Sequence, residues 1–306
     1  MHPPQPVLVV GSIGLDDIET PFGKVERVLG GSAIYASAAA SLFAPVRFVG
    51  VAGEDLPRDA LAFLEGRGVD LQGLERVPGG KTFRWSGRYH FDLNNRDTLL
   101  TELNTLGTFD PKLPPSYRGT PFVFLGNLLP SIQTKVLDRL GAKPHLAVLD
   151  TMNFWIEGTR KDLEAVLARV DVLIVNDSEA RQLAGTPNLV AAARAVQKMG
   201  PRTVVIKKGE HGALLFREEG LFSAPALPLE QVFDPTGAGD AFAGGFIGAL
   251  AREGRTDEAA MRRAVIAGSA VASFCVEQFS VEGLKERTPA DLEQRLAQFR
   301  ALAHWY

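Results

Sequence analysis

The stretch from Val232 to Leu250 constrains the fold and the function of this 306-residue chain more than any other. Asp234 and Pro235 end an extended segment, because the residue before a proline is pushed out of the helical region. Four small residues then form a tight turn, and the small and apolar residues that follow predict a buried helix from about Ala238. Glycines just before a helix let N–H groups converge on one point, where the helix dipole adds to their positive field. The stretch therefore predicts an anion site, most often one for a phosphate.

Asp240 is a carboxylate placed in the same pocket as the expected anion. As a purely structural residue, it is an acid in the first helical turn, where the helix dipole favours it. As a catalytic residue, it takes the proton from a hydroxyl that attacks a phosphoryl group, while the amides of the turn hold the charge of that group. We favour the catalytic interpretation, because Asp-Pro-Thr-Gly-Ala-Gly-Asp before an apolar helix is far more constrained than a lone Gly-x-Gly.

Composition and charge narrow the class of protein. The formal net charge is −3 and no long run of Lys or Arg occurs, which argues against nucleic acid or an anionic membrane as the main partner. The N-terminus has no basic segment before an apolar core, and no uncharged apolar run approaches the ~20 residues that span a bilayer. The single cysteine, Cys275, excludes an internal disulfide and fits a reducing compartment. We expect a cytoplasmic protein that acts on small molecules.

Short apolar runs alternate with helical segments from Phe122 onward, which predicts a parallel sheet with crossover helices. The length and the 45% hydrophobic composition suffice for one large α/β domain with an appendage. Ligands on such sheets bind at the carboxyl ends of the strands, a position that Asp150, Asn153 and Asn176 share. The expected core strands are Val7–Val10, Val46–Val51, Phe122–Leu125, Leu146–Leu149, Val170–Val175 and Thr203–Ile206. The expected helices are 33–42, 58–66, 131–140, 159–168, 178–184, 188–199, 258–274 and 288–302.

A second, smaller sheet is expected outside the main core. Residues 82–91 alternate and are rich in aromatic side chains, as a two-faced strand should be. The polar, alternating residues 20–29 and the short run 98–101 complete this sheet. Arg84, Trp85 and Tyr89 are either ligand contacts from this sheet or ordinary surface and packing residues.

Two motifs near the N-terminus have a structural and a functional interpretation. Asp16 follows the first strand, where an aspartate is commonly a turn or cap residue but also suits substrate hydroxyls. Gly30 and Gly31 open an alanine-rich helix, and they mark either a plain helix start or a close approach of backbone to a ligand.

Three further motifs lie in the C-terminal half. Asn176 and Glu179 form a capping box after a strand. The turn Gly209–Gly212 suits nucleotide phosphates or ribose, with Lys207 or Lys208 supplying positive charge. The segment that includes Gly268 and Ala272 is slim enough for an adenine to lie on it, although small residues there also permit helix packing.

The segment 234–245 resembles the C-terminal signature of the PfkB (ribokinase-like) family of carbohydrate and nucleoside kinases. The other motifs occur in the family's order, so the resemblance covers almost the whole chain: the aspartate five residues after Gly11, the Gly-Gly pair, Asn-x-x-Glu and Gly-x-x-Gly. It implies one kinase domain over residues 1–306, a three-layer α/β/α sandwich with a mostly parallel central sheet. A small β-sheet lid, formed by about 17–29 and 82–101, is implied as well.

The resemblance also implies an activity: transfer of the γ-phosphate of ATP to a hydroxyl of a sugar or sugar-like molecule, with Mg²⁺. Many relatives also use a monovalent cation such as K⁺ beside the glycine loop. The lid of such kinases excludes water from the acceptor, and it is often a surface for homodimers. The implied catalytic residues are Asp240 as the base and Gly237, Ala238 and Gly239 as the anion hole. The implied acceptor contacts are Asp16, Gly30, Gly31, Tyr35, Arg84 and Asn153; those for the nucleotide are Asn176, Lys207, Gly209, Gly212, Thr236, Gly268 and Ala272, with Glu179 bound to Mg²⁺ through water.

One departure from the family pattern concerns the acceptor. Tyr35 stands where the family has an asparagine that bonds the sugar, which suggests a different acceptor surface, one that stacks against a ring. The aromatic lid strand favours the same interpretation, so a nucleoside kinase is the alternative to a sugar kinase. Two other classes stay open: a non-catalytic ligand sensor on a kinase fold, and a nicotinamide oxidoreductase, which the missing Gly-x-Gly-x-x-Gly fingerprint disfavours.

Overall fold

A large, mostly parallel sheet forms the centre of the computed structural model, which describes residues 3–218 and 220–303. Its strand order is β13-β12-β11-β10-β9-β8-β1-β4-β5, and only β12 and β13 run antiparallel to their neighbours. The chain leaves β1 toward β4 on one side and returns to β8 on the other, so the topology switches at β1. The strands are β1 Val7–Val10, β4 Val46–Gly53, β5 Asp70–Val77, β8 Phe122–Leu125, β9 Leu146–Asp150, β10 Val172–Asn176, β11 Thr203–Lys207, β12 Ala213–Arg217 and β13 Gly220–Ala224.

Helices cover both faces of this sheet, because its strands are apolar on both sides. Val7 and Val9 belong to one hydrophobic cluster with α1, α8 and α9, whereas Leu8 and Val10 belong to a second cluster with α3, α5, α6 and α7. The predicted three-layer α/β/α sandwich is therefore confirmed. The helices are α1 Ser32–Ala40, α2 Ala62–Gly66, α3 Pro130–Arg139, α4 Asn153–Gly158, α5 Arg160–Leu167, α6 Asp177–Ala184, α7 Leu189–Gln197, α8 Ala238–Glu253, α9 Glu258–Cys275, α10 Glu282–Lys285 and α11 Pro289–Ala303.

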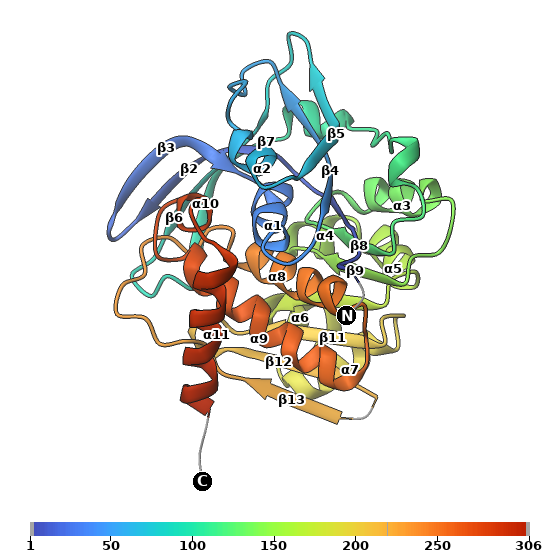
Figure 1. The fold of residues 1–306 in the computed structure, drawn as a ribbon, viewed down its shortest axis with the longest axis vertical. Helices are drawn as coiled ribbons and strands as arrows, with labels where there is room; N and C mark the ends of the chain where they lie inside the picture. The colour runs from blue at the N-terminus through green and yellow to red at the C-terminus, as the bar shows by residue number, and fades with distance from the viewer. Residues whose placement is uncertain (1–2, 219, 304–306) are drawn as a thin grey trace.

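A separate four-stranded sheet projects to one side of the large sheet, with the order β3-β2-β6-β7 (Figure 1). We call this sheet the lid. Its strands are β2 Gly14–Thr20, β3 Gly23–Gly30, β6 Phe83–Tyr89 and β7 Arg96–Glu102. The lid begins at Gly14, before the expected residue 17, because the chain passes almost directly from β1 into β2.

Several elements differ from the sequence-based expectations. Helix α2 begins at Ala62 and not at residue 58, since residues 58–61 form turns. Strand β5 and the hairpin β12–β13 were not expected, because their polar and apolar residues mix without a clear period. No helix of the described residues is apolar over a length that would cross a membrane.

Helices α1 and α8 pack at very short range, and this contact fixes the start of α8. A Cβ atom added to Gly244 would lie 2.3 Å from the carbonyl oxygen of Ala36, and one on Gly248 would lie 3.0 Å from Cα of Ala40. The nearest atoms at both positions belong to the backbone of α1, so a side chain there must push the helices apart. The alanine-rich α1 is accordingly buried along its whole length.

Gly244→Ala is expected to destabilise the fold by about 1–3 kcal/mol, because the added methyl group overlaps the backbone of α1. The free energy of unfolding is measured by urea denaturation. Gly158→Ala is the matched control, since no atom lies within 4 Å of a Cβ added there. Equal stability of the two variants would contradict close packing of α8 on α1.

Candidate active site

Polar residues from four elements meet at the carboxyl edge of the large sheet. Asp150 ends β9, Lys207 ends β11, and Glu179 and Asp240 lie in the first turns of α6 and α8. The ammonium group of Lys207 lies 3.4 Å from Oδ2 of Asp150. A Cβ atom added to Gly239 would lie 2.7 Å from the same ammonium nitrogen, so Lys207 reaches directly over the glycine loop. Lys207, and not Lys208, is therefore the lysine that faces the predicted anion site.

The glycine loop opens α8 as the sequence predicts. Gly237 caps the helix with φ of 76°, a left-handed conformation that favours glycine. The N–H group of Ala238 donates to the carbonyl of Pro235 at 3.2 Å and belongs to the turn. Among the described residues, the N–H groups of Gly239 and Asp240 have no backbone partner, as is usual for the first turn of a helix. These two amides, beside the ammonium group of Lys207, form the open anion site.

The carboxyl group of Asp240 is held in a state suited to proton transfer. Burial, followed by the charges of Asp150 and Glu179, raises its pKa to about 7 against the opposing charge of Lys207. The residue stays partly exposed, so a substrate has access to it. A carboxyl group with a pKa near neutrality is a competent general base at physiological pH.

Glu179 caps α6 and leaves one carboxylate oxygen for the metal role that its motif also allows. Its backbone N–H donates to Oδ1 of Asn176 at 2.8 Å, and its Oε2 accepts from the N–H of Asn176 at 2.8 Å, which completes a capping box. Its Oε1 has no donor among the described residues. Burial, followed by the charge of Asp150, raises the pKa of Glu179 to about 7. A buried carboxyl group of this kind, without a cation bonded to it, suits hydrogen bonds from the water molecules around Mg²⁺.

Asp16 faces the same space from the lid. It is 4% exposed, and its Oδ1 has no hydrogen-bond partner in the described part of the chain. Burial raises the pKa of Asp16 to about 8, with further contributions from Asp234 and Asp240. A buried carboxyl oxygen without a donor indicates a partner that the ligand supplies.

The Gly-Gly pair explains how Asp16 fits into this space. A Cβ atom on Gly30 would lie 1.9 Å from Oδ2 of Asp16, and one on Gly31 would lie 2.4 Å from the carbonyl oxygen of Ser12. Gly31 also has φ of 98°, which side chains rarely adopt. The pair is therefore required by the position of Asp16 and by the turn into α1.

Tyr35 does not provide the acceptor surface that its position suggested. It is 1% exposed, and a Cβ atom added to Gly237 would lie 2.4 Å from three atoms of its ring. The ring thus packs behind the glycine loop, and its hydroxyl is buried without a described partner. The tyrosine supports the loop from the protein interior.

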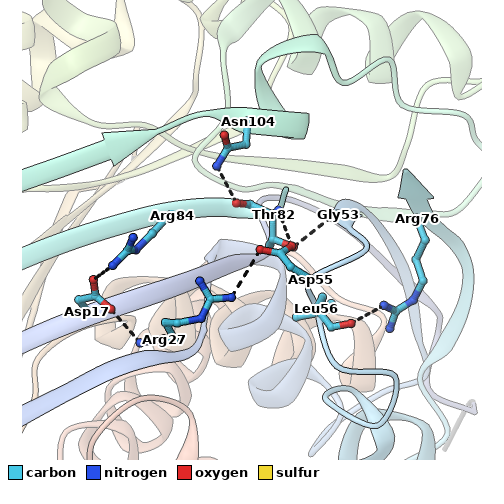
Figure 2. Close-up of polar contacts among 9 residues, drawn as sticks. All are labelled: Asp17, Arg27, Gly53, Asp55, Leu56, Arg76, Thr82, Arg84 and Asn104. Atoms are coloured by element: carbon cyan, nitrogen blue, oxygen red, sulfur yellow. Dashed lines mark hydrogen bonds and ion pairs between the residues drawn. The ribbon is translucent and has the colours of Figure 1, made fainter. Parts of the chain in front are cut away.

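Arg84 lies outside the site, which corrects its predicted role as an acceptor contact. Strand residues alternate between faces, and Arg84 pairs in register with Leu15 while Trp85 pairs with Asp16. Figure 2 shows Arg84 directed at Asp17, with 2.6 Å between the guanidinium and the carboxylate. Trp85 and Tyr89 are on the face of Asp16, which we call the inner face of the lid.

Two predicted nucleotide residues are glycines for reasons of packing. Gly212 is buried with φ of 81°, and a Cβ atom there would lie 2.1 Å from the carbonyl oxygen of Ala224. Gly268 lies at the α8–α9 contact, where an added Cβ atom would lie 2.6 Å from the carbonyl oxygen of Phe242. Neither glycine is open to a nucleotide, which corrects both predictions. Gly209 is exposed and Ala272 half-buried, so these two stay predictions.

The remaining predicted residues line the rim. Asn153 donates to Oε1 of Gln182 at 2.8 Å, which holds α4 against α6. Thr236 bonds to the lid through the hydroxyl of Tyr89, with 3.2 Å between the oxygens. The sequence placed Asp150 at the edge but gave it no role, although its strand-end position was the signal. In the described residues, no group of three or more His, Cys, Asp or Glu side chains is arranged to hold a metal directly.

Comparisons with known proteins show which family model and which relatives this chain matches. Residues 134–287 match the model of the pfkB family carbohydrate kinases. The chain is 32% identical over 264 residues to a cytidine kinase of Thermococcus kodakarensis, covering 84% of this chain and 92% of the relative. It is 28% identical to a ribokinase of Arabidopsis thaliana, covering 90% of this chain and 77% of the relative.

Solved structures share the fold. A nucleoside kinase of Burkholderia thailandensis in complex with inosine has a TM-score of 0.77 at 20% identity, covering 97% of this chain and 98% of that one. The Arabidopsis thaliana ribokinase with ribose and ATP has a TM-score of 0.76 at 23% identity, covering 96% and 99%. At these identities the likeness concerns the fold alone, and it confirms the predicted fold class.

Asp16→Asn is expected to stabilise the unliganded protein at high pH. Because the pKa of Asp16 is about 8 in the folded protein and 3.8 for an unperturbed aspartate, the folded state retains a proton that the unfolded chain releases between these two pH values. Stability is therefore lost as pH rises through this range. Asparagine removes the loss, so we expect a Tm higher by about 2–6 °C near pH 8.5 and no gain near pH 4. Differential scanning calorimetry measures it, with Asp59→Asn, an exposed site, as the control; equal pH profiles of the two variants would refute the buried state of Asp16.

Proposed function

Because the chain belongs to the pfkB family of carbohydrate kinases, we propose that it transfers the γ-phosphate of ATP to a sugar hydroxyl of a nucleoside. Membership of the family makes the chain a phosphotransferase with a sugar or sugar-like acceptor. The observation that carries the nucleoside proposal is the 32% identity to a cytidine kinase over 84% of the chain. A ribokinase, the sugar-specific alternative, is 28% identical over a similar share.

The inner face of the lid supports an acceptor with a flat ring. Trp85 is next to Asp16 in the β2–β6 register, and its indole lies over Gly87, where a Cβ atom would come within 2.1 Å of the ring. The indole N–H reaches Oγ1 of Thr98 at 3.4 Å. Glycine at position 87 thus lets the indole lie flat along the strand. A flat aromatic surface beside a buried carboxylate suits a base stacked above and a ribose bonded below.

Each residue of the site has its own role in the proposed reaction. Asp16 accepts hydrogen bonds from hydroxyls of the acceptor, which orients the reacting oxygen toward Asp240. Asp240 removes its proton as the new O–P bond forms and the bond to ADP breaks. The amides of Gly239 and Asp240, together with Lys207, hold the charge of the moving phosphoryl group. Preorganisation of these donors on one helix start lowers the barrier, because little has to move.

Mg²⁺ is the divalent cation that the family implies, and the residues present fit it. Glu179 and Asp150 are buried carboxylates whose pKa values are raised chiefly by burial, so added positive charge is favourable there. Mg²⁺ retains most of its waters, and Glu179 would hold it through that shell. When bound, the ion neutralises charge on the phosphates of ATP.

Protein donors already bond to the oxygens beside the glycine loop, where a monovalent cation such as K⁺ would bind. Asp234 is fully buried, and its two oxygens accept from the N–H groups of Thr236 at 2.8 Å and Ser280 at 2.9 Å. The carbonyl of Thr236 accepts from the thiol of Cys275 at 3.6 Å. We propose that these donors hold the loop in place of an ion.

The outer face of the lid, opposite Asp16, is the surface that we propose for a homodimer. Phe22 lies at the tip of the β2–β3 hairpin and is 57% exposed, with its ring centroid 6.0 Å from that of Phe233. The raised pKa of Asp240 and the intact loop argue against a non-catalytic sensor, since a sensor has no use for a base.

We place the protein in the cytoplasm, as its single buried cysteine suggests.

A panel of acceptors tests the proposed function. With ATP and Mg²⁺, ADP release is measured for cytidine, uridine, adenosine, inosine, ribose, fructose and 2-dehydro-3-deoxygluconate. We expect a nucleoside to have the highest kcat/KM, because it alone uses both Trp85 and Asp16. Asp240→Asn is the control and should lower kcat by a factor of about 10²–10⁴ with the fold intact. A free sugar preferred over every nucleoside would overturn the proposal.

Kinase activity is expected to be independent of monovalent cations. Replacing K⁺ and Na⁺ by tetramethylammonium should change kcat by less than about twofold, because Cys275 and Ser280 already supply the loop's partners. Initial rates across a KCl titration at constant ionic strength provide the measurement. Activation by K⁺ of about tenfold or more would show that an ion displaces these donors.

A further inference from the structure

Arg96 is a cation of the lid that the reaction described above does not use. It begins β7 and pairs in register with Tyr89 of β6, so both side chains are on the inner face. Its Cζ lies 5.8 Å from the centroid of the Trp85 ring. Its side chain is exposed, and it forms no ion pair among the described residues, whereas Arg84 and Arg88 pair with carboxylates of β2.

The hairpin that carries Arg96 bridges the active site. On one side, the hydroxyl of Tyr89 lies 3.2 Å from Oγ1 of Thr236, at the start of the glycine loop. On the other side, the turn of the hairpin meets the nucleotide turn: a Cβ atom added to Gly209 would lie 2.5 Å from Oδ1 of Asn94. Arg96 opposes Tyr89 across the hairpin and follows Asn94 by two residues, so it lies close to both contacts.

This hairpin is a built structure and not a loose loop. Oδ1 of Asp92 accepts from the N–H groups of Asn94 and Asn95, both at 3.1 Å. Below the turn, the imidazole of His90 lies 3.0 Å from Oδ2 of Asp97. These bonds fix the register in which Arg96 opposes Tyr89.

The site has an excess of negative charge, which a further cation would offset. Asp150, Glu179 and Asp240 share one nearby lysine, and ATP adds further negative charge. Against the dominant effect of burial, the positive charge of Arg96 lowers the pKa of Asp240 and of Glu179, so its field reaches both. A guanidinium group offers paired donors that match phosphate oxygens.

We propose that Arg96 is a catalytic residue that donates hydrogen bonds to the phosphoryl group in transfer, from the side opposite the glycine loop. The inference rests on the proposed function, since it needs ATP and an acceptor in place. The proton of the acceptor hydroxyl goes to Asp240, the bond to phosphorus forms, and ADP leaves with the electron pair of the broken bond. Arg96 stays protonated throughout and neutralises charge on the non-bridging oxygens of the transferred phosphoryl group.

Substitution of Arg96 tests this role. Arg96→Ala should lower kcat by about 10²–10³, the cost of losing one oxyanion donor, and leave the acceptor KM within about threefold. Arg96→Lys should retain part of the activity, and guanidinium in millimolar amounts should partly restore Arg96→Ala. Arg88→Ala is the matched control, because Arg88 is an exposed arginine of the same hairpin that pairs with Glu19 at 2.9 Å. A kcat for Arg96→Ala within threefold of wild type, or an equal loss in Arg88→Ala, overturns the proposal.

The pH profile separates a catalytic role from a structural one. Because Arg96 favours the charged form of Asp240, its removal raises the pKa of that carboxyl group, and the acid limb of kcat/KM should move to higher pH by about half a unit or more. An unchanged acid limb contradicts the proposal. The two proposals can fail separately. If the wild-type enzyme does not phosphorylate nucleosides, the proposed acceptor is wrong. If the wild type is active and Arg96→Ala is equally active on the same acceptor, the proposed role of Arg96 is wrong.

Discussion

Repulsion among buried carboxyl groups is the interaction on which the active site depends. Asp150, Glu179 and Asp240 lie around a single ammonium group, and burial raises the pKa of each. Without ligands, the cluster is relieved by retaining protons. Binding of a divalent cation and the positive groups of the lid relieves it differently, by replacing those protons. The same charge distribution therefore favours binding of a divalent cation and keeps Asp240 basic enough for the role that we propose for it.

Glycines let this cluster form at atomic distances. Gly30 leaves room for the carboxylate of Asp16, Gly239 leaves room for Lys207, and Gly244 lets α8 settle on α1. The ring of Tyr35 then closes the space behind Gly237. Each contact removes a degree of freedom from the start of α8, so the amides and Asp240 are held in one arrangement before a substrate binds. Such preorganisation is what an anion site needs in order to favour the transition state.

Signals local in sequence predicted the sheet, the glycine loop and the capping box, because each depends on residues within a few positions of one another. These local signals could not predict the direction in which a side chain points. Arg84 and Trp85 are on opposite faces of an alternating strand, and the sequence could not tell which of the two faces turns toward Asp16. Gly212 is a glycine because of a strand 12 residues later, a contact that only the tertiary structure reveals. Arg96 was missed for the same reason, since its role arises from pairing with Tyr89 across a hairpin.

The two faces of the lid have different physical tasks. At its base, the outer face is tied to the large sheet: Asp55 accepts from the N–H and the hydroxyl of Thr82, both at 2.7 Å, and Thr82 accepts from the N–H of Gly53 at 3.0 Å (Figure 2). At its far end, the hairpin meets the turn Gly209–Gly212 through Asn94. The lid is thus joined to the large sheet at its base, close to Asp16, and contacts the C-terminal half of the site at its far end, close to Arg96. In the reaction that we propose, orientation of the acceptor therefore depends on the base of the lid, and charge neutralisation depends on its far end.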